Sequence, residues 1–144
     1  MSTTMPDELG WRRFGPDSAE RAALVALSEV LGVPLRPRAL ELRPGTMFEV
    51  EGVDPESRYL FQVVVNRGTY TSQQRNKVLA DMFKLLWLRA TRFPEAEVGL
   101  VLSETTAEAF KPRSWTSLAA RELGFALYVV TTDRRVTKLA SDES

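Results

Sequence analysis

Two polar side chains stand in neighbouring strands of a predicted hairpin, where their oxygens could bind a cation. The segment FEVEGVDPESRYLFQVVV, residues 48–65, predicts two strands joined by the acidic turn DPES. Glu51 lies on the first strand, and Gln62 interrupts the otherwise apolar second strand. The chain has no cysteine and no histidine, which excludes disulfides, thiolate nucleophiles and imidazole ligands. Any metal must therefore be a hard cation such as Mg²⁺, held by carboxylate and carbonyl oxygens.

The same residues also have purely structural interpretations. Glu51 could be a surface acid on a half-exposed strand. Gln62 has apolar neighbours on both faces of its strand, so a buried amide there must find hydrogen-bond partners, either Glu51 or the backbone. Lys77, Asp81 and Lys84 share one helix face at spacings of four and three, which predicts a salt-bridged stripe exposed to solvent.

The elements that would position these side chains follow the order α β β β α β α β. A helix is predicted over 17–31, beginning at Asp17 with Glu20 as capping partner and ending at Gly32. Three short strands are predicted at about 38–43, 46–53 and 58–66. The final strand–helix–strand unit, over 97–133, requires a parallel crossover. The fold class is therefore α/β, a mixed central sheet flanked by helices.

The long second helix begins after Thr71, with Gln74 as capping partner, and Pro94 ends it. Its packing stripe is predicted from apolar residues at helical spacing. They are Val78, Leu79, Met82, Phe83, Leu86, Ala90 and Phe93. Trp87 on this helix is expected in the core or in an interface, where it could serve a homodimer.

Composition predicts one soluble domain, because 44% of the 144 residues are hydrophobic and 26% are charged. We divide it into an N-terminal arm at 1–15, a domain at 16–133 and a C-terminal tail, short helix or coil, at 134–144. Trp11 and Phe14 could dock the arm. No run of eighteen apolar residues and no secretory signal occur, so we expect no membrane contact and a cytoplasmic location.

Positive charge is concentrated between residues 58 and 92, although the formal net charge of the chain is zero. This segment contains seven basic residues and one acid, Asp81. It is either a surface that faces phosphates or a solvated helix whose basic end suits the helix dipole. Arg67, Arg75 and Lys77 are the candidate contacts for nucleic acid.

The hairpin VEGVDPESRYLFQVVV, the helix segment KVLADMFKLLWL and the final unit ending in ELGFALYVV together resemble the PD-(D/E)xK nuclease superfamily, which has the restriction-endonuclease-like fold. The resemblance covers about residues 17–132. It implies that Glu51 takes the place of the first metal ligand and that Gln62 takes the place of the (D/E) residue. It also implies Mg²⁺ or Mn²⁺ as the cofactor of an active member, with Glu20 or Glu29 as a further ligand.

Two positions depart from the pattern of this superfamily. Gln62 offers an amide where a carboxylate is expected, and Val64 stands where the lysine is expected. The preferred hypothesis is thus a nuclease-like domain with a degenerate catalytic motif that binds nucleic acid or protein. An alternative is an active metal-dependent nuclease that uses Glu51, Gln62 and a displaced lysine, Lys77.

A third hypothesis belongs to another class of protein. The opening α β β β α order and the segment LGVP also resemble type III secretion chaperones, which implies a small homodimeric adaptor. Antiparallel pairing of the strands at 97–104 and 125–133, without a helix between them, would favour this hypothesis.

Overall fold

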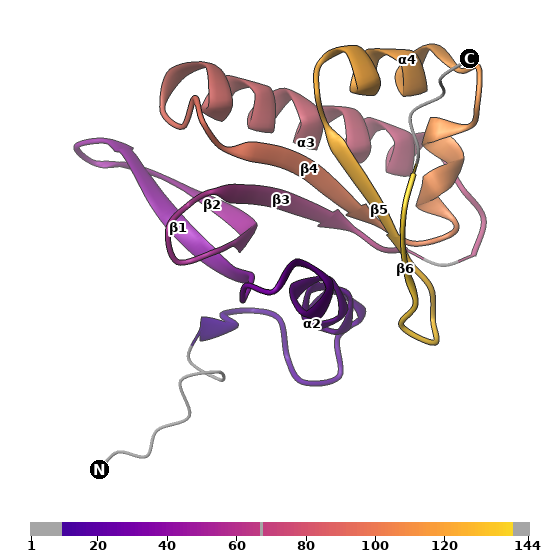
Figure 1. Ribbon diagram of the computed structural model, residues 1–144, viewed down its shortest axis with the longest axis horizontal. Coiled ribbons are helices and arrows are strands. Elements are labelled where there is room, and N and C mark those ends of the chain that lie inside the picture. Colours follow the sequence, from indigo (N-terminus) through magenta and orange to yellow (C-terminus); the bar gives the residue numbers. More distant parts are fainter. Residues whose placement is uncertain (1–9, 67, 140–144) are drawn as a thin grey trace.

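The computed structural model describes residues 10–66 and 68–139, which form a mixed six-stranded sheet with helices on both faces (Figure 1). In chain order the elements are α2 (Ala19–Leu31), β1 (Arg36–Arg43), β2 (Thr46–Val53), β3 (Tyr59–Val64), α3 (Ser72–Thr91), β4 (Glu97–Leu102), the 3-10 helix η1 (Thr106–Phe110), α4 (Trp115–Glu122), β5 (Ala126–Val130) and β6 (Val136–Lys138). The predicted order α β β β α β α β is therefore present, with η1 and β6 as additions.

The strands lie in the sheet in the order in which they occur along the chain, β1-β2-β3-β4-β5-β6. The pairs β1/β2 and β2/β3 are antiparallel, β3/β4 and β4/β5 are parallel, and β5/β6 is antiparallel. Parallel neighbours cannot be joined by a tight turn, so a helical segment connects each parallel pair. The first connection is α3, and the second contains η1 and α4.

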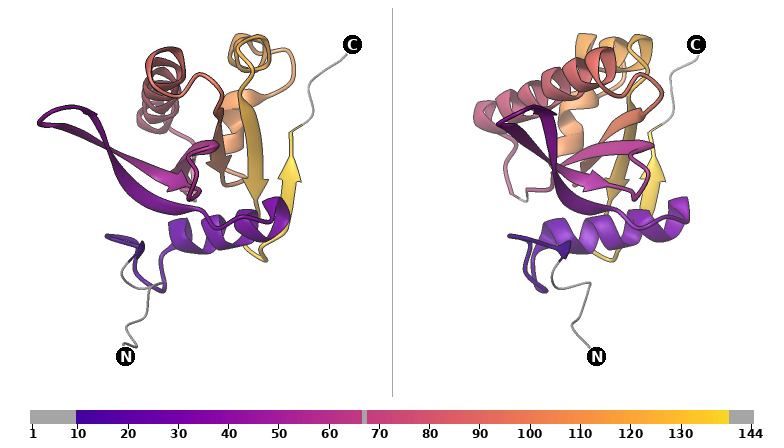
Figure 2. Two further views of the ribbon diagram at one scale, coloured as in Figure 1. Left: turned by 60° about the vertical axis from the view of Figure 1, so that its left-hand side comes forward. Right: turned by 90° about the vertical axis from the view of Figure 1, so that its left-hand side faces the viewer.

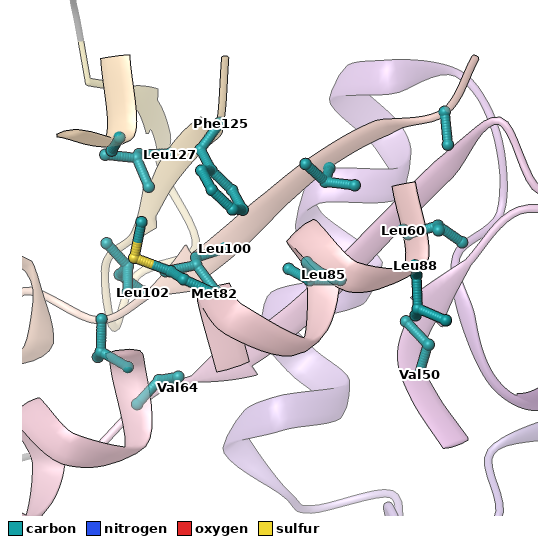
Figure 3. Packing of buried hydrophobic residues seen from close by; sticks show 14 of the residues in the cluster. Val50, Leu60, Val64, Met82, Leu85, Leu88, Leu100, Leu102, Phe125 and Leu127 are labelled. Atoms are coloured by element: carbon teal, nitrogen blue, oxygen red, sulfur yellow. The ribbon is translucent and has the colours of Figure 1, made fainter. Parts of the chain in front are cut away.

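The two faces of the sheet have separate apolar cores. Helices α3 and α4 cover one face, and α2 covers the other (Figure 2). Side chains alternate along β3, so Leu60 and Val64 join the core under α3 while Phe61 and Val63 join the core over α2. Figure 3 shows Leu85 and Leu88 of α3 against the first of these cores. This alternation places Gln62, which lies between Leu60 and Val64, on the α3 side.

Both long helices begin at a hydroxyl side chain. Thr71 and Gln74 form the predicted capping box at the start of α3. The prediction for α2 is displaced by one residue, because Ser18 is the cap and its Oγ accepts from the N–H of Arg21. Helix α3 ends at Thr91, before Pro94.

The predicted packing stripe of α3 is partly wrong. The residues of α3 that are buried are Val78, Asp81, Met82, Leu85 and Leu88. Phe83, which the prediction placed inward, is 74% exposed, and Trp87 is 43% exposed. The predicted stripe and the buried stripe are adjacent, because α3 is apolar over a wide arc of its surface. Which of the two is buried is decided by the packing of α3 on the sheet.

The segments that flank the predicted domain also contribute to the structure. Trp11 and Phe14 are buried in the core over α2, as expected if they dock the N-terminal segment. Strand β6 forms within the predicted tail, where a short helix or coil was expected, because β5 offers it a free edge. Among the described residues, no helix is both long enough and apolar enough to cross a membrane.

Candidate functional site

The side chains of Glu51 and Gln62 bridge β2 and β3 near the point where the paired register between these strands ends. That register comprises Gly52 with Phe61 and Val53 with Leu60. One residue further, the N–H of Glu51 donates to Gln62 Oε1 at 2.9 Å, and the N–H of Val63 donates to Glu51 Oε1 at 2.7 Å. Side-chain oxygens thus satisfy buried backbone N–H groups, which the fold requires.

Helix α3 contributes a second carboxylate to this place, Asp81. The amide of Gln62 donates from Nε2 to Asp81 Oδ1 at 3.4 Å, and Lys77 Nζ donates to Asp81 Oδ2 at 2.8 Å. Lys84 Nζ lies 3.9 Å from Asp81 Oδ1. The lysines can reach Asp81 because residues three and four apart on a helix are neighbours. Glu51, Gln62, Asp81 and Lys77 are called the polar cluster below.

The N-terminal segment closes the outer side of the polar cluster. Arg13 donates from Nη2 to Glu51 Oε2 at 2.6 Å and from Nη1 to Glu49 Oε1 at 2.8 Å. Arg12 Nε lies 3.1 Å from Glu49 Oε2. Glu51 and Asp81 are only 6% and 1% exposed, so these two carboxylates have lost most of their water. Arg13 neutralises Glu51, and Lys77 neutralises Asp81.

Burial dominates the titration of Glu51 and raises the pKa of its carboxyl above the usual 4.5. The negative charge of Asp81 raises this pKa further, whereas the Val63 N–H, Lys77 and Arg13 lower it. Between pH 4.5 and the raised pKa, the native chain keeps a proton that the unfolded chain releases. The contribution of Glu51 to stability is therefore greatest below pH 4.5 and is lost as the pH rises through the raised pKa.

Glu51→Gln is expected to remove this pH dependence. The variant keeps an oxygen that can accept from the Val63 N–H, but it has no proton to release. The free energy of unfolding of the wild type should fall relative to that of the variant as the pH rises from 4.5 through the raised pKa. Urea denaturation of both proteins between about pH 4 and 8 measures the difference. Parallel pH profiles of the two proteins would contradict the raised pKa.

The structure brings three of the predicted site residues together and separates others. Glu51, Gln62 and Lys77 are joined to one another through Asp81 and the backbone of β2, whereas Val64 is buried in the apolar core. Arg75 is exposed on the first turn of α3, and Arg67 lies outside the described residues. Glu20 and Glu29 belong to α2, on the opposite side of the sheet from α3.

Asp81 is the residue that the sequence prediction placed wrongly. It was expected in a solvent-exposed stripe, but it is 1% exposed, although its predicted ion pairs with Lys77 and Lys84 are present. The sequence did contain a signal. Asp81 lies three residues after Val78 and four residues before Leu85. A helical stripe that contains the apolar residues Val78 and Leu85 therefore also contains Asp81.

The donor set does not fit a divalent cation as the side chains are arranged. Each carboxylate oxygen of Glu51 and Asp81 already accepts from the chain, and Gln62 Oε1 accepts from the Glu51 N–H. Among residues 10–66 and 68–139, no group of three acidic, histidine or cysteine side chains could hold a metal. The polar cluster instead provides hydrogen-bond partners for buried polar groups and links α3 to the hairpin.

Comparisons with family models, with curated proteins and with solved structures found no match to this chain.

Proposed function

We propose that this chain is a nuclease-like domain of the restriction-endonuclease type that has lost catalysis and binds nucleic acid. The arrangement of the sheet supports the first part of this proposal. A three-stranded antiparallel unit is followed by α3 and by the parallel strands β4 and β5, with helices on both faces. The hairpin that resembles the catalytic hairpin of the superfamily lies beside α3, as the resemblance implies.

The loss of catalysis rests on one observation, the complete internal engagement of the polar cluster. A catalytic Mg²⁺ needs free carboxylate oxygens and usually keeps several waters. Here the oxygens of Glu51 and Asp81 accept from Arg13, Val63, Gln62 and Lys77. A metal would have to displace a salt bridge or a backbone hydrogen bond from each carboxylate.

Nucleic acid is the favoured partner because positive charge lines the side of α3 that faces the β1–β2 hairpin. Lys77 and Lys84 are seven residues apart and therefore lie on the same face of the helix. Their side chains are 47% and 44% exposed even while they neutralise Asp81. Contacts between lysines and phosphates supply much of the affinity of proteins for nucleic acid.

Two measurements on the purified chain test this proposal. Labelled DNA or RNA should remain uncleaved in Mg²⁺ or Mn²⁺, while fluorescence anisotropy should detect binding that weakens as salt is raised. Lys84→Gln should weaken binding and reduce the salt slope by roughly 0.9 for duplex DNA if one phosphate contact is lost. Lys138→Gln, on the opposite edge of the sheet, is the matched control and should bind like the wild type. Absence of binding at low salt would contradict the proposal.

A second candidate, an active metal-dependent nuclease, is favoured by the position of Asp81. With Asp81, the hairpin and α3 supply two carboxylates and one lysine, which are the residue types that the superfamily uses. Metal-dependent cleavage that disappears in both Glu51→Gln and Asp81→Asn would establish this candidate instead. The homodimeric adaptor is less well supported, because β4 and β5 are parallel and joined through α4.

A further inference from the structure

A groove lies between the tip of the β1–β2 hairpin and the C-terminal half of α3. Its volume is about 460 Å³. The lining residues are Leu42, Arg43, Thr46, Trp87, Thr91 and Arg92. This hairpin groove is distinct from the polar cluster, because none of its lining residues belongs to that cluster. In Figure 2 the β1–β2 hairpin projects from the body of the sheet.

Trp87 is held in the hairpin groove but is not enclosed by it. Its ring meets Phe48 edge to face, with centroids 6.2 Å apart and an interplanar angle of 74°. The residue nevertheless remains 43% exposed. Phe83, one helical turn earlier, is 74% exposed. A large aromatic side chain that is fixed at one edge and open elsewhere can stack on a planar ligand at little cost in entropy.

The hairpin groove carries positive charge. Arg43 and Arg92 are both exposed, and no acidic residue lines the groove. Neither arginine forms an ion pair with any described residue, whereas Arg12, Arg13 and Arg58 all do. The groove therefore presents two exposed guanidinium groups beside an exposed indole, which is complementary to a partner with both negative charges and flat rings.

We propose that the hairpin groove binds single-stranded nucleic acid, with a base stacked on Trp87 and backbone phosphates at Arg43 and Arg92. This inference rests on the proposed function. It specifies where nucleic acid binds and that single strands are preferred to duplex. An aromatic platform within a basic groove is the combination that binds single strands with little dependence on sequence. Duplex bases are already stacked on each other, so Trp87 should contribute to single-strand binding alone.

Binding of a fluorescein-labelled oligo(dT) of about 15 nucleotides, compared with a duplex of equal length, tests this inference. Trp87→Leu should weaken oligo(dT) binding about tenfold and leave duplex binding unchanged, because one base stack is lost. Trp115→Leu is the matched control, since Trp115 is 69% exposed on α4 and outside the groove. Arg43→Gln and Arg92→Gln should each reduce the salt slope by roughly 0.7.

A second measurement keeps the test independent of the stability of the Trp87 variant. In Trp115→Phe, Trp87 is the only exposed tryptophan, because Trp11 is 2% exposed. Oligo(dT) should quench the fluorescence of this variant at the concentrations at which anisotropy detects binding. Binding without quenching would overturn the inference.

The outcomes separate the inference from the proposed function. If the wild type binds neither oligo(dT) nor duplex, both fail together. If it binds both and Trp87→Leu binds oligo(dT) as well as the wild type does, only the hairpin groove is wrong. If Trp87→Leu abolishes a concentration-dependent dimer and leaves oligo(dT) affinity unchanged, the groove is occupied by a second copy of this chain, and the inference is overturned.

Discussion

Gln62→Glu is expected to destabilise the protein by about 3 kcal/mol at pH 8 and to make its stability depend on divalent metal. The new carboxylate can still accept from the Glu51 N–H, but it would face Asp81 Oδ1, to which the amide of Gln62 now donates at 3.4 Å. Three carboxylates would then converge where two are now balanced by cations. Thermal unfolding with and without Mg²⁺ measures both effects.

Metal should restore much of this loss in Gln62→Glu and should leave the wild type unchanged. Mg²⁺ at about one hundred times its dissociation constant stabilises a native state by roughly 2.7 kcal/mol. Gln74→Glu is the matched control, because a glutamate keeps the acceptor that Gln74 Oε1 offers to the Thr71 N–H at the start of α3. Equal Mg²⁺ stabilisation of the wild type would mean that the polar cluster already binds metal.

Gly99→Ala is expected to lower the free energy of unfolding by about 3 kcal/mol, although it adds a single methyl group. Gly99 lies in β4, paired with Phe61 of β3 and with Ala126 of β5. A Cβ atom at Gly99 would overlap the backbone oxygen of Ala126 and the ring of Phe61. The backbone oxygen belongs to the sheet and cannot turn aside, and the ring is fully buried. Urea denaturation followed by circular dichroism measures the loss.

Gly15→Ala serves as the control for the loss of a glycine. A Cβ atom there would have no neighbour within 4 Å, so we expect a change within about 0.5 kcal/mol. An equally small effect of Gly99→Ala would contradict the tight packing of β4 against Phe61 in this structure.

Strong local signals made most of the fold predictable. Thr71 and Gln74 mark the start of α3 because their hydrogen bonds join residues three apart, which needs no distant partner. The apolar runs of β4 and β5 indicate strands that are buried on both faces. Strand β6 was missed because its three residues, VTK, are mostly exposed, and only the open edge of β5 makes them a strand.

The candidate site was predictable only in part, because its residues come from three segments that are separate in the sequence. The resemblance to a nuclease hairpin singled out Glu51 and Gln62, and the possibility of a displaced lysine singled out Lys77. The partners Asp81 and Arg13 could not be assigned in this way. Arg13 reaches Glu51 across 38 positions of sequence, and no local pattern specifies such a contact.

The sequence by itself determined the types and order of the elements, the absence of thiolate and imidazole chemistry, and the presence of an amide side chain at position 62. Only the tertiary structure decided that Asp81 is buried, that Trp87 is exposed, and that the oxygens of the polar cluster are fully engaged. The physical reason lies in the range of the interactions. Secondary structure follows from hydrogen bonds and side-chain periodicity over a few residues, whereas burial and charge compensation depend on which face of α3 meets the sheet.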